Sequence, residues 1–204
     1  MASLSQLKER TIHDTVAWKL FATEVGRAQM IEARWSVSEK GKLVDKYILH
    51  VREPGMVRLE VVGKSVTVWN GSAGIWIDNS MRVHMPLVVK PEFGEAAYFE
   101  FPALRKGKWN TCTYNLKEAT SESGGRLFNV VSVTNHLVDA MTNYTYTFGA
   151  QSRLLTSMGV EYRGMWGGGE KDFLYAVELL DLFAMVDESL FGLKPPAGYT
   201  GIGS

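Results

Sequence analysis

The chain has 204 residues, of which 46% are hydrophobic and 22% are charged. These proportions are ordinary for a globular protein and exclude intrinsic disorder for most of the chain. Lys and Arg number 22, as do Asp and Glu, so the formal net charge is zero. This balance excludes the basic surface of a general nucleic-acid-binding protein. The length favours one domain, and we expect a single domain over residues 1–204.

Cysteine content and hydropathy limit the compartment and the chemistry. The only cysteine, Cys112, excludes an internal disulfide and a multi-thiolate metal site. No apolar run reaches the roughly 18 residues needed to span a bilayer. Residues 1–10 hold no apolar signal core. We therefore expect either a cytoplasmic protein or the mature form of an exported protein whose signal segment has been removed.

The first segment with a clear period is N-terminal. Apolar residues recur at helical spacing from Leu4 to Leu20, with Ser3 in a position that suits an N-cap. Gly26 then ends the pattern. The segment between Ser3 and Gly26 is therefore predicted to be a helix.

After Gly26 the apolar period becomes twofold, which predicts strands with one dry and one wet face. Turn signals at Gly41, Gly63-Lys64 and Asn70-Gly71 divide this segment into an antiparallel meander. The expected strands are residues 31–37, 46–51, 57–61, 66–68, 75–77 and 81–85.

The second half of the chain is less regular. Residues 88–108 lose the alternation and are expected to form a short helix or a covering loop. Strands are expected again at residues 109–114, 127–134 and 144–148. Residues 153–163 and 172–184 are predicted to form a final hairpin around Gly167-Gly168-Gly169.

Catalytic and metal-binding patterns are weak. The histidines are not spaced as zinc ligands on a helix; they are His13, His50, His84 and His136. There is no Gly-x-Ser-x-Gly nucleophile motif, and the triple glycine lacks the Lys of a phosphate-binding loop. We therefore expect no catalytic site, no metal site and no cofactor.

The content of large apolar side chains is the more informative feature. The chain has six Trp, eight Tyr, nine Phe and nine Met. In a closed sandwich these residues would be ordinary core. In an incompletely closed sheet they would line a cavity, for which the flexible and polarizable Met side chain is well suited. Composition leaves both interpretations open.

Two motifs favour the second interpretation. The first covers residues 51–60, VREPGMVRLE, and residues 65–78, SVTVWNGSAGIWID; the second covers residues 187–199, DESLFGLKPPAGY. In this order, behind an N-terminal helix, they resemble the periplasmic lipoprotein carrier family, the LolA-like proteins. The resemblance extends from about Leu4 to Tyr199. It departs from the family pattern at Glu53, which separates Arg52 from Pro54, at Ser72 in the turn, and across residues 88–143.

The resemblance implies an α+β fold in which a strongly curved antiparallel sheet forms an unclosed half β-barrel with covering helices. It implies a non-catalytic carrier that binds acyl chains of lipids or lipoproteins in an apolar cavity. Arg52 matches a family arginine that holds the helical lid, so we expect a latch there. Trp69, Trp76 and Phe191 match family aromatic positions, for which core packing is the favoured role.

Alternation along the expected strands gives the candidates for the lipid-facing side, which are Trp35, Val57, Leu59 and Val66. The resemblance further implies a periplasmic location. The alternative function that the resemblance implies is sensing: a domain of the same fold would bind a membrane-anchored regulatory protein in envelope signalling. The expected partners are therefore acyl chains or a membrane-anchored protein, and not nucleic acid.

Overall fold

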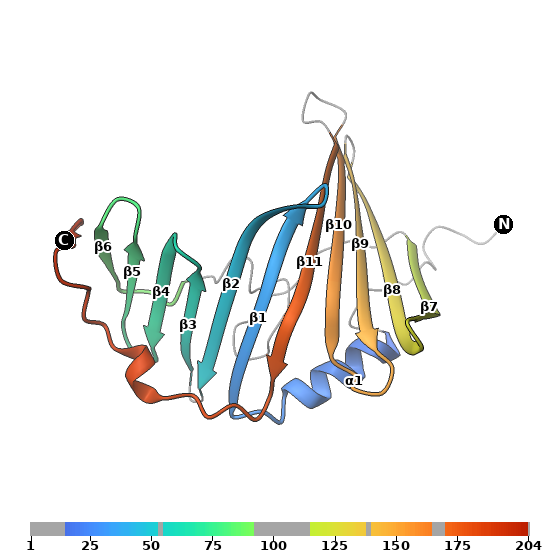
Figure 1. Ribbon diagram of the computed structural model, residues 1–204, viewed down its shortest axis with the longest axis horizontal. Helices are drawn as coiled ribbons and strands as arrows, with labels where there is room; N and C mark the ends of the chain where they lie inside the picture. Colours follow the sequence, from blue (N-terminus) through green and yellow to red (C-terminus); the bar gives the residue numbers. More distant parts are fainter. Residues whose placement is uncertain (1–14, 53–54, 92–114, 138–139, 165–169, 204) are drawn as a thin grey trace, which may run out of the picture. The chain divides into compact units, whose positions relative to one another are not determined.

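The computed structural model describes residues 15–52, 55–91, 115–137, 140–164 and 170–203 (Figure 1). The chain divides into two compact units, each described below by itself. Unit 1 comprises Met1–Thr23, Ser38–Leu43 and Gly107–Ala176, and unit 2 comprises Glu24–Val37, Val44–Lys106 and Val177–Ser204. The expectation of a single domain stays a prediction.

Strands dominate the described residues. The strand order is β12-β6-β5-β4-β3-β2-β1-β11-β10-β9-β8-β7, an unclosed series. The helical elements are α1 (Val16–Val25) and the 3-10 helix η4 (Glu188–Phe191). The strands of the meander are β1 (Met30–Glu39), β2 (Lys42–Arg52), β3 (Met56–Val61), β4 (Ser65–Asn70), β5 (Gly74–Asp78) and β6 (Val83–Leu87). The others are β7 (Asn115–Ser123), β8 (Arg126–Leu137), β9 (Ala140–Gly149), β10 (Leu155–Gly164), β11 (Glu170–Asp181) and β12 (Thr200–Gly201).

The predicted fold class, a helix-covered α+β fold on an antiparallel sheet, is wrong. Within the described ranges α1 is the only α-helix, and it has ten residues. The sheet is mixed, because β12 pairs in parallel with β6. Of the helix expected between Ser3 and Gly26, the described part is α1, and residues 3–14 lie outside the described residues. Residues 92–108 of the segment expected to be a helix or covering loop also lie outside the described residues.

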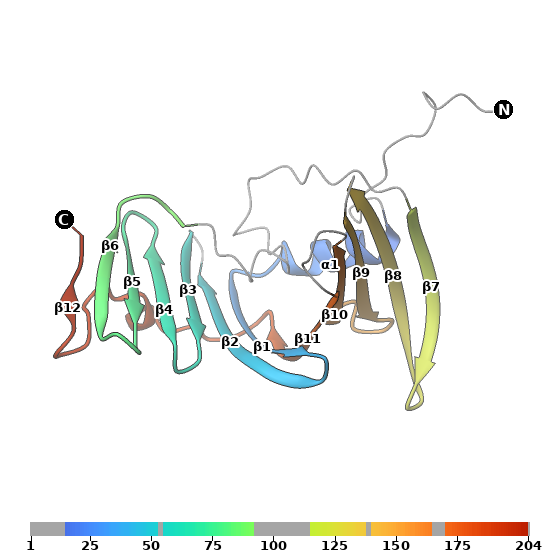
Figure 2. The same cartoon turned by 90° about the horizontal axis from the view of Figure 1, so that it is seen from above.

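Unit 1 buries one face of its strands against α1 (Figure 2). Antiparallel register places Val131 of β8, Tyr146 of β9 and Met158 of β10 side by side, and all three are buried. Trp18 meets the ring of Tyr146 edge-on, with ring centroids 6.2 Å apart. The helix begins at Thr15, whose hydroxyl accepts a hydrogen bond from the Trp18 N–H as an N-cap does. The contact between the Trp18 and Tyr146 rings holds the helix against the aromatic part of the sheet.

Unit 2 contains the antiparallel meander from β2 to β6, most of β1, and the C-terminal segment. Residues directly opposite each other in an antiparallel pair point to the same face of the sheet. Leu49 lies opposite Leu59, and Val57 lies opposite both Val51 and Trp69. We call the face that carries these side chains the apolar face.

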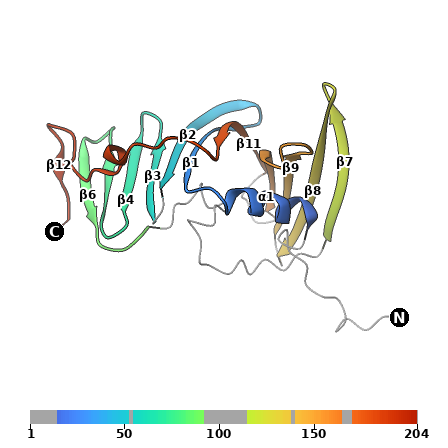
Figure 3. The ribbon, with the colours of Figure 1, turned by 90° about the horizontal axis from the view of Figure 1, so that it is seen from below.

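The C-terminal strap, defined here as residues 182–199, crosses the other face of unit 2 (Figure 3). Ala184, Val186 and Phe191 of the strap pack against Val66, Val68, Ile75 and Ile77 of the sheet. Asp187 caps η4, since its carboxylate accepts a hydrogen bond from the Ser189 N–H at 2.8 Å. After the strap, β12 pairs with β6. We call this side of the sheet the strap face.

Candidate apolar ligand-binding face

The apolar face of unit 2 extends over at least four strands. Trp35 of β1 stacks on Tyr47 of β2, with ring centroids 5.2 Å apart and planes only 3° from parallel. The stack places Trp35 on the same face as Tyr47, which lies opposite Val61 in the register. The buried residues of this face on β2, β3 and β4 are Tyr47, Leu49, Val51, Val57, Leu59 and Trp69.

The structure brings three of the four predicted lipid-facing residues together. Trp35, Val57 and Leu59 belong to the apolar face. Val66 belongs to the strap face, since it lies opposite Glu60 and Ile77 and packs in the cluster with Phe191. Alternation along one strand cannot show which positions of two strands share a face, because the register between strands decides it.

Tyr47, Leu49, Val51 and Trp69 also belong to the apolar face and were not among the predicted site residues. Leu49 and Val57 have no exposed surface, and Val51 is 1% exposed. An acyl chain can therefore reach these side chains only by displacing the groups that now enclose them. In the sequence, Leu49 and Val51 alternate with His50, which shows that they share a face of β2. Only the pairing of β2 with β3 shows that this face is the one that carries Val57 and Leu59.

On β1, β2 and β3 the strap face carries charged groups, whereas on β4 and β5 it carries the apolar cluster with Phe191. Arg34 Nε donates a hydrogen bond to Glu32 at 2.8 Å, and Arg58 pairs with Glu60 at 3.2 Å. His50 lies among them, and its Nδ1 is buried without a hydrogen-bond partner. Burial lowers the pKa of His50, while the charge of Glu32 acts in the opposite direction. The two faces of the same strands therefore offer an apolar ligand very different surroundings.

Arg52, the predicted latch, contacts the strap. Its Nη1 donates a hydrogen bond to the carbonyl oxygen of Val186 at 3.3 Å, and its Nη2 lies 3.3 Å from the carboxylate of Glu188. Arg58 makes a second contact of this kind, to the carbonyl oxygen of Leu190 at 3.5 Å. The partner of Arg52 is thus an extended segment and a 3-10 turn. Its role in ligand retention stays a prediction.

Replacing Arg52 by Leu is expected to loosen the strap. The change removes one hydrogen bond to Val186, which contributes about 1 kcal/mol, and an exposed ion pair that contributes less. Urea unfolding should show this loss, and limited proteolysis should cut the strap faster. Arg34→Leu is the matched control, because the ion pair of Arg34 is with Glu32 of its own strand. Equal protease sensitivity in the two variants would remove Arg52 from the latch.

Metal sites and membrane spans are the other features that the sequence analysis considered. Among the described residues, no three His, Cys, Asp or Glu side chains are placed to hold a metal ion. No helix within the described ranges is both long and apolar enough to cross a membrane. His13 and Cys112 lie outside the described residues.

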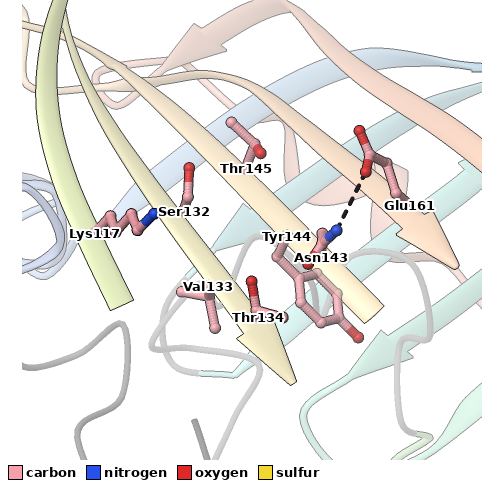
Figure 4. A pocket seen from close by; sticks show the side chains of 8 residues that line it. All are labelled: Lys117, Ser132, Val133, Thr134, Asn143, Tyr144, Thr145 and Glu161. Atoms are coloured by element: carbon pink, nitrogen blue, oxygen red, sulfur yellow. Dashed lines mark hydrogen bonds between the residues drawn. The ribbon is translucent and has the colours of Figure 1, made fainter. Parts of the chain in front are cut away.

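Unit 1 has a hollow of a different character, and Figure 4 shows the residues that line it. The register places Ser132, Thr145 and Asn143 on the face opposite the one that carries Tyr146 and packs on α1. The hollow measures about 310 Å³, and its lining includes Lys117, Ser132, Thr134, Asn143, Thr145 and Glu161. Asn143 donates a hydrogen bond to the Glu161 carboxylate at 3.3 Å. Hydroxyl, amide and charged groups dominate this lining, so the hollow does not suit an acyl chain.

Comparisons with known proteins were made on sequence and on structure. No protein-family model matches the chain, and no curated protein matches it. Among solved structures, the chain is similar to a LolA superfamily protein from Nitrosomonas europaea, with a TM-score of 0.39 and 6% sequence identity. The match covers 87% of this chain and 98% of that one. At this score and identity, the likeness does not place the chain in that superfamily.

Proposed function

We propose that this protein binds the acyl chains of lipids or lipoproteins on the apolar face of unit 2, without covalent chemistry. The observation that carries the proposal is the grouping of Trp35, Leu49, Val57, Leu59 and Trp69 on one side of the meander. The charged pairs around His50 lie on the other side. The motifs that resemble the lipoprotein carriers contribute Val57, Leu59 and Trp69 to this face.

The free energy of burial explains why such a face suits an acyl chain. Each methylene moved out of water contributes about 0.8 kcal/mol, and a flat ring such as that of Trp35 or Trp69 offers a large contact area. Because the face is closed in this structure, the bound chain must replace contacts that the protein already makes. The net affinity is then the free energy of the contacts with the acyl chain minus that of the protein contacts it replaces. This difference is smaller than the full burial energy, so the ligand can be released again.

Tryptophan quenching by dibromostearic acid tests the site directly. Bromine quenches indole fluorescence on contact, so dibromostearic acid should quench the wild-type protein more than stearic acid does. Trp35→Phe and Trp69→Phe should each remove part of this difference. Trp18→Phe is the matched control, because Trp18 packs on Tyr146 and Phe148 in unit 1.

Two results would count against the proposal. Equal effects of dibromostearic and stearic acid on the wild-type protein would mean that no acyl chain reaches an indole. Quenching that persists unchanged in both Trp35→Phe and Trp69→Phe would place the ligand elsewhere. Organic extraction of the purified protein, followed by mass spectrometry, should also recover an acyl lipid.

Carriage and sensing are the two functions that a lipid-binding protein of this kind could serve. A carrier in the periplasm would accelerate the transfer of a fluorescent lipid between separate vesicles. A sensor domain would bind lipid but leave the rate of transfer unchanged, and it would bind a membrane-anchored regulatory protein. We propose carriage in the periplasm as the first function; cell fractionation tests the location, and the transfer rate distinguishes carriage from sensing.

A further inference from the structure

The C-terminal strap exposes two large apolar side chains almost completely. Phe183 is 91% exposed and Met185 is 94% exposed. Their neighbours Leu182, Ala184 and Val186 are buried. Leu182 and Phe183 form a turn at the end of β11, and residues 184–187 follow without helix or sheet pairing; along this segment every second side chain faces the protein and the others face solvent.

The exposed side chains lie on a segment that is held in place. The buried neighbours Ala184 and Val186 belong to the cluster around Phe191, and Arg52 binds the carbonyl oxygen of Val186. At the other end, the Phe183 N–H donates to the Asp181 carboxylate at 2.8 Å. Phe183 and Met185 are therefore presented from a fixed backbone.

The backbone of this segment still has hydrogen-bonding capacity. Within the part of the chain that the structure describes, the N–H and C=O groups of Ala184 and Met185 form no hydrogen bond. Extended backbone with unpaired groups can pair with another strand. In an extended chain the groups of Ala184 and those of Met185 point to opposite edges, so a partner strand along one edge would satisfy the groups of one of these residues while its side chains contact Phe183 and Met185.

The charges around the exposed pair are mainly acidic. Asp181 precedes Phe183, and Asp187 and Glu188 follow Met185. Two cations also lie near this segment: Arg27 lines a hollow with Phe183 and lies 3.7 Å from Glu24 in an ion pair, and Arg52 pairs with Glu188 at 3.3 Å. Residues Arg27, Ala28, Gln29 and Met30 also line a hollow of about 290 Å³ beside Phe183. A complementary partner would carry basic groups and at least one apolar side chain that fits this hollow.

We propose that residues 182–187 dock an extended, basic segment of a partner protein, which pairs with the strap backbone and covers Phe183 and Met185. A membrane surface fits less well. Immersion in hydrocarbon would leave the backbone groups of Ala184 and Met185 without partners. An anionic lipid surface would also repel Asp181, Asp187 and Glu188.

The test uses a synthetic octapeptide array in which Val, Ile, Leu or Phe alternates with Lys or Arg. Binding to the full chain is measured by fluorescence anisotropy. We expect basic peptides to bind, and the double substitution Phe183→Ser with Met185→Ser to weaken binding about tenfold or more, a change of about 1.4 kcal/mol. N-methylation of the peptide backbone should abolish binding, since it removes the donors that strand pairing requires.

The control protein carries Val62→Ser with Met81→Ser, which changes two other exposed apolar residues of unit 2. It should bind the peptides as the wild-type protein does. The proposal is overturned if no basic peptide binds, if Glu-containing peptides bind equally well, or if the Phe183/Met185 variant retains full binding. It is also overturned if only vesicles of phosphatidylcholine and phosphatidylglycerol bind in a manner that depends on these two residues. Dibromostearic acid should still quench the double variant, so this test is independent of the proposed acyl-binding face.

Discussion

Phe191→Ala is expected to lower the free energy of unfolding by about 3–5 kcal/mol, the range for truncating a buried Phe. Phe191 is 3% exposed and sits where the strap packs on Val66, Val68, Ile75 and Ile77. Its loss would leave a cavity between the strap and the sheet, and neither side can close it easily. The backbone of η4 is held by the Asp187 cap, and the sheet is held by its ladder of hydrogen bonds. Urea unfolding followed by circular dichroism would measure the loss.

Phe183→Ala is the matched control on the same strap. It removes the same atoms, but from a side chain that is 91% exposed, so stability should change by no more than about 0.5 kcal/mol. A similar loss in both variants would show that the strap does not distinguish its two faces. A small loss for Phe191→Ala would show that the strap contributes little to the stability of unit 2.

The meander of unit 2 was predictable because its turns have local causes. Gly63 adopts a φ of 77°, a conformation that glycine allows at no steric cost. Asn70 closes the next turn, since its side-chain oxygen accepts hydrogen bonds from the N–H groups of Ser72 and Ala73. Between such turns the alternation of apolar residues fixes the strands. The sequence predictions for β1 to β5 are confirmed for these reasons.

The features that were missed depend on contacts distant in sequence. β7 has the sequence NLKEATSES, and residues 117–123 are exposed; without a buried face it shows no apolar alternation. It is a strand because β8 pairs with it, from Asn115 opposite Thr134 to Ser123 opposite Arg126. The sequence predicted only part of the role of the C-terminal motif, residues 187–199. Core packing of Phe191 is confirmed, but the sequence did not show that Phe191 belongs to a strap that packs on the sheet and also binds Arg52.

The candidate site shows the same division between local and long-range causes. Trp35, Val57 and Leu59 share the apolar face as expected, because each lies on a strand with clear alternation. Val66 was grouped with them although the hairpin at Gly63-Lys64 puts it opposite Glu60. The loop between the paired residues Val61 and Ser65 holds three residues, one more than a Gly63-Lys64 turn, and one residue of register moves a side chain to the other face.

Gly74→Ala is expected to destabilise unit 2 by overpacking, for which a cost of about 1–3 kcal/mol is typical. A Cβ at Gly74 would lie 2.6 Å from the carbonyl oxygen of Val68, 2.8 Å from the Trp69 ring and 3.2 Å from the Leu87 Cβ. The Val68 oxygen belongs to the strand that pairs with β5, so it cannot move away without disturbing the ladder. We therefore expect a cost at the upper end of this range.

The same substitution at Gly159 separates steric conflict from a general effect of alanine in a strand. A Cβ there would meet only the Thr145 Cβ, at 3.8 Å, which is an ordinary contact. Gly159→Ala should be neutral or slightly stabilising, because alanine reduces the freedom of the unfolded chain. Gly74→Ala should in addition shift the Trp69 ring, so quenching of Trp69 by dibromostearic acid should change in this variant and not in Gly159→Ala. Equal stability of the two variants would mean that β4 and β5 tolerate a side chain at Gly74.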